Sequence, residues 1–406
     1  MDNKSILDQT ITSRQTKEAF HPDTIELLNV LFNKLSDRER DVLERRFGLF
    51  MNKKETLEKI GQAHKLTRER IRQIEVASIK KIKQLEDLNK NISGLKKTII
   101  QLLEEHGGLM EKEYMFDNLV NMSADLGKTK NKEDADIHRN HFNFLISKLL
   151  PAEFEEIKKS KYFKDSFKLK YQSLDHLESL TEELLGKIKQ AKKILLTDEL
   201  INLTKESDNY KNNEEKFKIP NKMDVSKILN NALFSENVDL INNNKIVYSL
   251  LKAARDIEQN KFGYWGIRDW REIKPKTIND KIYLILKNNN KPMHFTEIAK
   301  KINQTGFDKK QANAATVHNE LILDSKYILV GRGLYGLRDW GYREGTVADV
   351  VEAILMSSDK PLSRDEIIAK VLEQRDVKKA TINLALVDKK KFEQLSNGKY
   401  QLKNVK

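Results

Sequence analysis

Four side chains between positions 68 and 73 are of the types that recognise DNA bases: Arg68, Glu69, Arg72 and Gln73. Arginine forks onto the two acceptors of guanine, glutamate accepts from cytosine, and glutamine pairs with adenine. All four lie in the first two turns of a predicted helix. The opposite face of that helix is apolar and carries Ile71, Ile74, Ile79 and Ile82, with Ser78 beside them. The pattern predicts a helix that is packed on one side and exposes base-recognising side chains on the other.

The helix that comes first in this region has clear start and stop signals. Ser36 and Glu39 form a capping-box pattern, and the helix is predicted to run to about Phe47. Gly48 follows as the stop signal.

Two shorter helices follow around a tight turn. Thr56 caps the second helix, residues 57–63, and Thr67 caps the third. Gly61 lacks a side chain, so another helix can approach closely there. Residues 36–85 hold 14 Lys and Arg against 8 Asp and Glu, a net +6. This arrangement predicts a DNA-binding helix-turn-helix, because a solvated charged helix alone would lack the surrounding pattern.

The segment resembles region four of sigma-70-type RNA polymerase sigma factors. The motifs that carry the resemblance are Leu35-Ser36-x-Arg38-Glu39-Arg40-x-Val42-Leu43-x-x-Arg46-Phe47-Gly48-Leu49, Thr56-Leu57-Glu58-x-Ile60-Gly61 and Thr67-Arg68-Glu69-Arg70-Ile71-Arg72-Gln73-Ile74-Glu75. The resemblance covers about 50 of the 406 residues.

What the resemblance implies is recognition of the upstream, minus-thirty-five promoter element in double-stranded DNA. It implies base contacts from Arg68, Glu69 and Gln73. It also implies phosphate contacts from Arg38, Arg46, Thr56, Leu57, Arg70 and Arg72. The family's region four docks on the flap of the polymerase β subunit, so core RNA polymerase is the expected protein partner. Only 35 residues precede Ser36, so promoter melting, which the family assigns to its earlier regions, is not expected of this chain.

The C-terminal third of the chain contains an internal repeat. Lys291-Pro292-Met293 matches Lys360-Pro361-Leu362 at an offset of 69, and later landmarks match at an offset of 65. Each copy of the repeat is predicted to form three helices followed by two short apolar stretches around a glycine. Asn397-Gly398 is a strong hairpin signal. This order predicts two winged helix-turn-helix modules, with a compact α+β domain of no nucleic-acid role as the alternative.

The first of these modules resembles the HARE-type helix-turn-helix of the polymerase delta subunit. The residues that carry the resemblance are Lys291-Pro292-Met293-His294-Phe295-x-Glu297-Ile298-Ala299, Thr316-Val317-His318-Asn319-Glu320-Leu321 and Val330-Gly331-Arg332-Gly333-Leu334-Tyr335.

The predicted fold is mainly α with small β-hairpin wings. We divide the chain into a helical lead-in (1–35), the helix-turn-helix (36–90), two winged-helix-like modules (93–172 and 174–250), a helix with an aromatic connector (251–274), a HARE-type winged helix (275–342) and a C-terminal winged helix (345–406). Within the middle region the pattern predicts hairpins at 154–169 and 238–248, and helices at 225–233 and 250–260.

Composition excludes several function classes. Lys and Arg exceed Asp and Glu by 13, which favours polyanionic partners. The chain has no cysteine, so disulfides, thiol nucleophiles and Cys-ligated metals are excluded. No apolar run has the length of a membrane span, and the N-terminus lacks a signal-peptide pattern. We expect a cytoplasmic, non-enzymatic protein without cofactor, membrane partner or small-molecule substrate.

Four features suggest other chemistry, and each has an ordinary explanation. The string Gly331–Gly336 spells a dinucleotide fingerprint, but a hairpin is expected there instead of a helix start. His138 and His141 share a helical face, yet no third metal ligand accompanies them, and exposed histidines are ordinary. Glu-x-Lys triplets, as in nucleases, begin at Glu156 and Glu272, but such triplets arise by chance in a charged chain. Aromatic side chains that could stack on bases are expected to fill gaps between hairpins and helices: Trp265, Trp270, Tyr335 and Trp340.

Two functions therefore remain open besides a nuclease. The chain is either a sequence-specific DNA-binding transcription protein or a polymerase-bound modulator built from winged helices. The third helices of the two C-terminal modules, near Val317 and Ile382, discriminate between them. Basic solvent faces would indicate nucleic acid there, and apolar solvent faces would indicate protein.

Overall fold

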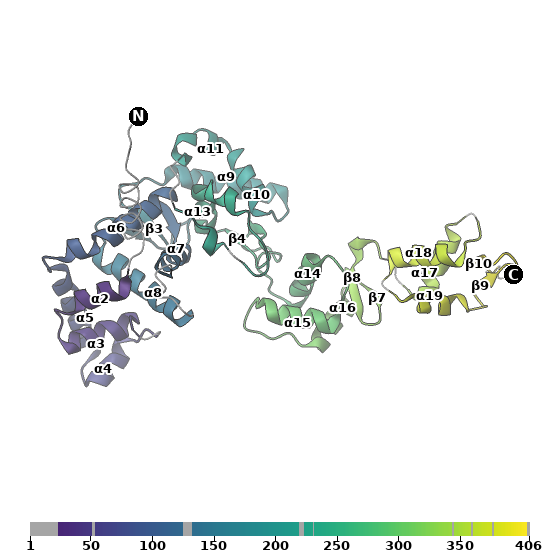
Figure 1. The fold of residues 1–406 in the computed structure, drawn as a ribbon, viewed down its shortest axis with the longest axis horizontal. Helices are drawn as coiled ribbons and strands as arrows, with labels where there is room; N and C mark the ends of the chain where they lie inside the picture. The colour runs from purple at the N-terminus through teal and green to yellow at the C-terminus, as the bar shows by residue number, and fades with distance from the viewer. Residues whose placement is uncertain are drawn as a thin grey trace, which may run out of the picture. The chain divides into compact units, whose positions relative to one another are not determined.

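The computed structural model describes residues 23–50, 53–124, 132–218, 223–229, 231–342, 345–358, 360–375 and 377–403. They form two compact units (Figure 1). The first ends at Gln259 and includes Gly263–Arg268, and the second comprises Asn260–Phe262 and the chain from Asp269 onward. Both units are mainly α-helical with small antiparallel sheets, as the sequence predicts. None of the helices in the described part of the chain has the length and apolar character of a membrane span.

The first unit begins with four helices that contain the predicted helix-turn-helix. Their bounds are α2 (Thr24–Phe32), α3 (Asp37–Phe47), α4 (Leu57–His64) and α5 (Arg68–Lys83). The predicted start and stop signals act as expected. Ser36 and Glu39 form a reciprocal capping box, and Gly48 ends α3 in the left-handed conformation. Residues 1–22 of the lead-in lie outside the described residues.

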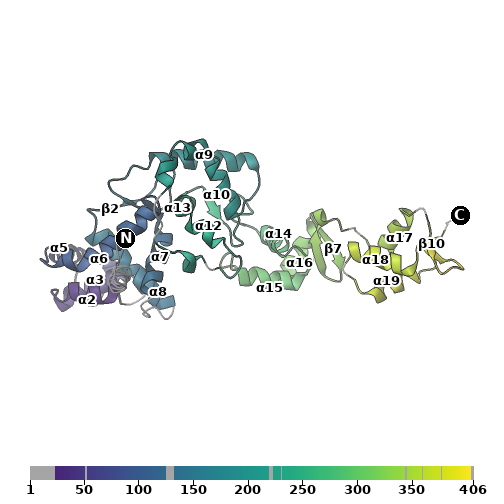
Figure 2. The ribbon, with the colours of Figure 1, turned by 45° about the horizontal axis from the view of Figure 1, so that its top comes forward.

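A module with one three-stranded sheet follows. Its elements are α6 (Leu88–Glu105), β1 (Leu109–Glu111), α7 (Lys112–Ala124), α8 (Lys132–Phe144), the π-helix η1 (Leu145–Leu149), β2 (Phe154–Ile157) and β3 (Ser166–Leu169). The strand order is β1-β3-β2, all antiparallel, with Met110 opposite Phe167 and Phe154 opposite Leu169. The predicted hairpin within 154–169 is therefore present. In Figure 2, α2, α3 and α5 lie beside α6 and α8, and α2 and α3 pack on α8.

The rest of the first unit differs from the prediction. Its elements are α9 (Asp175–Ala191), α10 (Thr197–Lys205), α11 (Asp208–Lys211), the 3-10 turns η2 (Glu214–Phe217) and η3 (Ser226–Ile228), α12 (Val238–Asn242), α13 (Lys245–Ala253), β4 (Ile257–Gln259) and β5 (Trp265–Ile267). The hairpin predicted at 238–248 is wrong, because α12 and α13 occupy that segment. The helix predicted at 225–233 shrinks to η3, and the one at 250–260 ends at Ala253 before strand β4.

The hairpin prediction at 238–248 is wrong because Asn237 and Asn244 begin helices and do not form a turn. Asn237 caps α12 by accepting from the backbone N–H of Leu240 at 3.1 Å, and Asn244 precedes α13. Almost every residue of α13 is buried, so packing within the unit fixes it as a helix instead of an edge hairpin.

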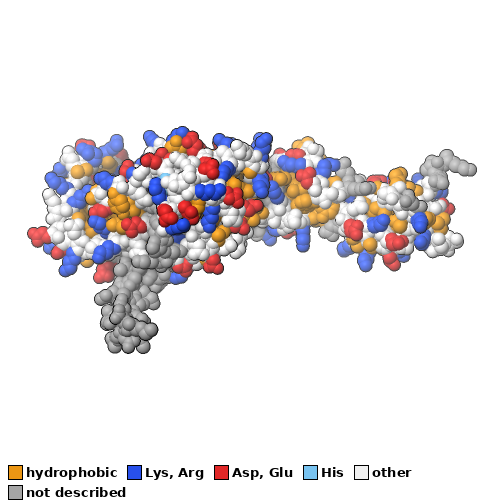
Figure 3. Space-filling model, turned by 90° about the horizontal axis from the view of Figure 1, so that it is seen from above, with side chains coloured by type: hydrophobic (Ala, Val, Ile, Leu, Met, Phe, Trp, Pro, Cys, Tyr) orange, Lys and Arg blue, Asp and Glu red, His pale blue; other side chains and the backbone are white. Residues whose placement is uncertain are grey.

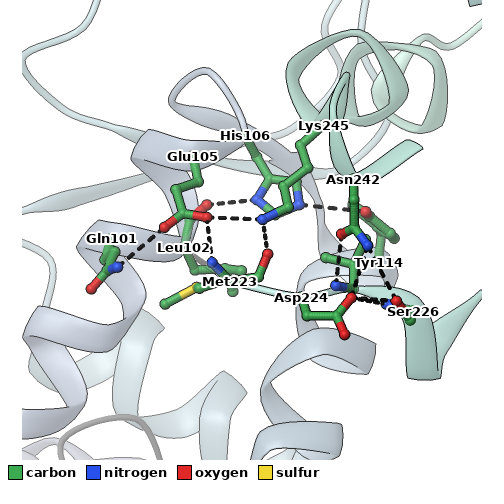
Figure 4. Close-up of polar contacts among 11 residues, drawn as sticks. Gln101, Leu102, Glu105, His106, Tyr114, Met223, Asp224, Ser226, Asn242 and Lys245 are labelled. Atoms are coloured by element: carbon green, nitrogen blue, oxygen red, sulfur yellow. Dashed lines mark hydrogen bonds and ion pairs between the residues drawn. The ribbon is translucent and has the colours of Figure 1, made fainter. Parts of the chain in front are cut away.

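A buried ion pair joins α13 to α6 (Figure 4). Lys245 Nζ lies 2.9 Å from Glu105 Oε2, and both side chains are almost fully buried. Glu105 also accepts from the Met223 backbone N–H and from Gln101. Burial acts to raise the pKa of Glu105, but these hydrogen bonds and Lys245 outweigh it, so the pKa lies below its usual value. Burial also lowers the pKa of the neighbouring His106 to about 4. Every charged group in this cluster has a partner, as a structural network requires.

The second unit contains the two predicted winged helices. The first comprises α14 (Ile278–Asn289), β6 (Met293–His294), α15 (Phe295–Thr305), α16 (Ala314–Leu323), β7 (Tyr327–Gly331), β8 (Leu334–Leu337) and the 3-10 turn η4 (Arg338–Trp340). The second comprises α17 (Val347–Met356), α18 (Arg364–Gln374), α19 (Lys379–Leu386), β9 (Phe392–Gln394) and β10 (Tyr400–Leu402).

In both modules the residue pair that joins the segment before the second helix to the last strand is also repeated. In the first module Met293 pairs with Tyr335, and in the second Leu362 pairs with Tyr400. These pairs are related by the offsets of 69 and 65 that the sequence gives. The repeat is therefore a repeat of tertiary structure as well as of sequence.

Candidate nucleic-acid interface

The turn between α4 and α5 depends on a glycine. A Cβ atom at Gly61 would lie 2.7 Å from the carbonyl oxygen of Leu66, closer than real contacts allow. Lys65 turns the chain in the left-handed conformation, and the Thr67 hydroxyl then caps α5 by accepting from the Arg70 N–H at 3.2 Å. Gly61 therefore lets the turn pass close to α4, which sets the angle between the two helices.

Helix α5 has the two faces that the sequence predicts. Ile71, Ser78 and Ile82 are buried, and Ile71 packs with Val42 and Ile60 in a small core. The opposite face is exposed to solvent along its first two turns and carries Arg68, Glu69, Arg70, Arg72 and Gln73. All five are side chains that the resemblance assigns to DNA.

The three side chains assigned to bases differ in their present contacts. The Arg68 guanidinium forms no hydrogen bond or ion pair with the described residues. Glu69 receives a two-pronged contact from Arg72, with Nε at 2.9 Å and Nη2 at 2.8 Å. These hydrogen bonds lower the pKa of Glu69, so its carboxylate is ionised and acts only as an acceptor. Gln73 accepts from Arg70 Nη1 at 3.1 Å, and its amide also hydrogen-bonds the Glu69 carboxylate.

The side chains assigned to phosphates fall into two groups. Arg38 is exposed, and Thr56 and Leu57 begin α4, where a helix N-terminus offers unpaired N–H groups to an anion. Arg46 is instead half-buried and has two internal partners. Its Nη1 donates to the Glu55 backbone oxygen at 3.2 Å, and its Nε lies 3.3 Å from Glu75. Arg46 thus helps to fix α5 against α3, a contact that the sequence analysis did not foresee.

Two more contacts hold α5 and α4 against α3. Lys81 near its C-terminus lies 3.0 Å from Glu39, the capping-box residue of α3. His64 at the end of α4 lies 2.6 Å from Asp41, which also pairs with Arg45. The only sequence signal for these pairs is opposite charge on neighbouring helices, which does not identify partners.

The predicted exposure of His138 and His141 is wrong, because both are buried at the contact between α2 and α8. Both Nδ1 atoms reach the hydroxyl of Thr24, at 2.8 Å and 2.9 Å. His141 Nε2 contacts the Leu49 backbone oxygen, which fixes Nε2 as the donor. His141 Nδ1 then accepts from Thr24, and His138 Nδ1 donates to Thr24. Burial lowers the pKa of His141 to about 4, so the His141 imidazole is neutral near pH 7.

The other suspected sites have local explanations. Glu156 pairs with Lys112 at 2.8 Å, and Glu272 pairs with Lys287 at 2.7 Å. Gly331–Gly336 spans the turn between β7 and β8, as predicted, and no helix begins inside it. Over the described ranges, no three His, Asp or Glu side chains come together as a metal site would require. Trp265 and Tyr335 are buried, in agreement with a gap-filling role.

The third helices of the second unit carry a different surface. Helix α16 contains no Lys or Arg, and it exposes Ile322 (61%) and Leu323 (81%). Helix α19 begins with Lys379 but exposes Leu384 (73%), and Val387 directly after it is 64% exposed. Apolar side chains on the surface of this unit are visible in Figure 3. These exposed apolar side chains are the feature that the sequence criterion set for a protein partner.

Comparison with known families agrees with both resemblances. Residues 31–84 match the model of "Sigma-70, region 4". Residues 276–340 match the HARE-HTH model, whose description includes the words "ASXL, restriction endonuclease HTH domain". The chain thus carries a sigma region-four-like segment and a HARE-type helix-turn-helix segment.

The relatives are sigma factors that match over the first of these segments. "RNA polymerase sigma factor SigA" of Lactococcus lactis subsp. cremoris is 50% identical over 58 residues, 14% of this chain and 16% of its own length. SigA of Microcystis aeruginosa is 53% identical over 58 residues, 14% of either chain. SigA of Listeria monocytogenes serovar 1/2a (strain ATCC BAA-679 / EGD-e) is 42% identical over 88 residues, 20% of this chain and 23% of its own. The chain therefore spans less than a quarter of these relatives. No solved structure matches it.

Proposed function

We propose that this protein is a DNA-binding transcription protein in which α5 enters the major groove of an upstream promoter element. Arg68, Glu69 and Gln73 contact base edges in this proposal. The side chains that position the helix on phosphates are Arg38, Arg46, Thr56, Leu57, Arg70 and Arg72. The observation that carries the proposal is the solvent exposure of the base-recognising face of α5, while its isoleucine face is packed away.

The contacts on α5 suggest how the helix is prepared for DNA. Arg72 holds Glu69 and Arg70 holds Gln73, so two base-contacting groups are already oriented by their neighbours. Arg68 has no such partner among the described residues and loses no internal hydrogen bond when it binds a base. Arg68 is therefore the side chain expected to give the largest gain in sequence discrimination.

The test is a selection of bound duplex sites with the full chain, followed by competition binding. Arg68→Ala should reduce the preference for one base pair by about 1–3 kcal/mol. Arg38→Ala, a matched control on α3, should weaken binding to selected and scrambled sites alike, because phosphates carry no sequence. Equal losses on both kinds of site for both variants would refute the assigned roles.

We also propose that the chain acts with RNA polymerase, with the β flap as the first partner to test. The region-four-like segment supports this partner. The apolar faces of α16 and α19 favour a contribution from the second unit, and they also favour the alternative of a polymerase-bound modulator. A pull-down of core polymerase subunits by the intact chain, repeated with Leu323→Asp, separates the two units' contributions. Retention of polymerase by the variant would exclude α16 as the contact.

A further inference from the structure

The C-terminal winged helix contains a pocket that the proposed function does not use. It has a volume of about 480 Å³ and lies between the end of α19, the β9–β10 hairpin and the start of α18. Pockets of about 300–1,000 Å³ are the usual size for bound ligand groups. Its lining residues are Arg364, Leu386, Val387, Lys389, Phe392, Glu393, Gln394, Tyr400 and Lys403.

The floor and the rim of this pocket differ in chemistry. Leu386, Phe392 and Tyr400 form an apolar floor that belongs to the module's core, and Val387 adds an exposed apolar edge. The rim is basic. Arg364 and Lys389 are exposed and form no ion pair with any residue of the described ranges.

The remaining charges of the rim do not cancel these cations. Among the described residues, the Lys403 ammonium donates only to the backbone oxygen of Lys389, at 3.3 Å. The one carboxylate in the lining, Glu393, accepts from Gln401 at 3.2 Å. Three cations and one carboxylate thus surround an apolar floor, which complements a ligand with an apolar centre and acidic flanks.

The repeat supplies an internal comparison. At the same offsets, Ile322 stands for Val387, so the exposed apolar edge is present in both modules. Phe295 stands for Arg364 and Asp324 stands for Lys389, so the HARE-type module lacks the free cations. Asp324 is also paired with Lys326 at 3.1 Å. Arg338 stands for Lys403, so the two cations Arg364 and Lys389, and not the whole rim, are particular to the C-terminal module.

We propose that this pocket binds an acidic peptide segment of another protein, with one apolar side chain on the floor and flanking carboxylates on Arg364 and Lys389. A protein segment fits better than a nucleic-acid duplex, because Leu384 in α19 and Val387 directly after it are exposed where a groove-binding helix needs polar groups. The inference does not depend on promoter recognition by α5, because it concerns different residues in the other unit.

The test is fluorescence polarisation with the full chain and fluorescein-labelled peptides. Each peptide has one central phenylalanine, and its flanks are made of glutamate, glutamine or lysine. The glutamate-flanked peptide should bind most tightly, and replacement of its phenylalanine by serine should abolish binding. Val387→Asp and the double variant Arg364→Glu/Lys389→Glu should each weaken binding about tenfold or more.

Matched controls separate the pocket from general effects. Ile322→Asp alters the equivalent exposed position of the other module, and Lys390→Glu alters the cation next to Lys389 outside the pocket lining. Both should leave peptide affinity unchanged, as should Arg68→Ala, which reports on the proposed DNA contact. Val387→Ser removes the apolar edge without adding charge. The unfolding midpoint of every variant shows whether the fold is retained.

Three results would overturn the inference. One is absence of binding by the glutamate-flanked peptide, and another is equal affinity for glutamate and lysine flanks. The third is a loss of duplex-DNA affinity in Arg364→Glu/Lys389→Glu with peptide affinity intact, which would assign the rim to phosphates.

Discussion

Helices α5 and α16 hold the same position in two helix-turn-helix modules but have opposite surfaces. Helix α5 exposes three arginines, a glutamate and a glutamine within its first six residues. Helix α16 has no Lys or Arg and exposes Ile322 and Leu323. The motif itself is therefore no indication of DNA binding, since the same packing of three helices supports either surface. Function follows from the side chains on the exposed face.

The two modules also differ in how they are supported. The three buried histidines in the described part of the chain, His106, His138 and His141, all belong to the first unit. Two of them fix α8 against α2, so the helix-turn-helix that carries α5 is attached to the following module by a buried polar contact. If α5 depends on this buried contact as well as on its own side chains, changes at either place should alter the first unit and not the second.

The largest effect is expected at the turn that sets α5. Gly61→Ala should destabilise the first unit by about 2–3 kcal/mol, because the new Cβ meets the Leu66 backbone oxygen. Gly94→Ala is the matched control. Gly94 is an exposed glycine inside α6 with nothing near its Cβ position, so the change should stabilise by about 0.5–1 kcal/mol.

The free energy of unfolding of each variant is measured by denaturant unfolding of the full chain, over the first transition. Effects of the same sign would show that the close approach at Gly61 is not what fixes α5.

Acid should weaken the first unit before the second. The pKa of His141 lies at about 4 in the folded protein against about 6.5 in the unfolded chain, so the unfolded state binds the proton first as pH falls. The contribution of neutral His141 is complete above about pH 6.5 and is lost as pH falls toward 4, with a cost of about 2 kcal/mol at pH 5. His106, with a pKa of about 4, adds to the effect in the same unit.

Unfolding free energies at pH 7 and pH 5 measure this effect. His141→Gln removes one titrating group and should flatten the pH dependence of the first unit, while His318→Gln in the HARE-type module should not. An unchanged pH dependence in His141→Gln would mean that the contact between α2 and α8 does not rely on a neutral imidazole.

Local signals account for what the sequence predicted well. The helix starts at Ser36, Thr56 and Thr67, and the stop at Gly48, depend on residues within one turn of the helix end. The internal repeat predicts the winged modules, because the same order of helices and hairpin fits both copies of the pattern. The exposed face of α5 followed from helical periodicity.

Several contacts that the sequence does not predict involve distant partners. The segment 238–248 looked like a hairpin because its asparagines resemble a turn, but the ion pair that buries Lys245 joins it to Glu105, 140 residues away. The contact of Thr24 with His141 spans 117 residues, and nothing near either residue announces it. The pairing of Arg46 with Glu75, 29 positions later, has no local signal either, and the assignment of Arg46 to phosphate stays a prediction.

A smaller effect is expected for a single phosphate contact on α5. Arg70→Ala should lower duplex affinity by about tenfold or less and reduce the slope of log affinity against log salt by about one, because one counterion fewer is released. Arg332→Ala, at the exposed turn of the β7–β8 hairpin, is the control and should leave the slope unchanged. Titrations across a range of salt concentrations measure both. A reduced slope for Arg332→Ala would place the wing on DNA and remove the contrast between the modules.

The smallest effect on DNA is expected at α16. Leu323→Ser changes a side chain that is 81% exposed, so stability should shift by no more than about 0.5 kcal/mol. Duplex affinity should not change, because the Leu323 side chain offers neither a charge to phosphate nor a hydrogen bond to a base. Polymerase retention in a pull-down should fall if α16 is a protein-binding surface. Weaker duplex binding by Leu323→Ser would instead place α16 against DNA, and an apolar exposed face would then no longer distinguish a protein-binding winged helix from a DNA-binding one.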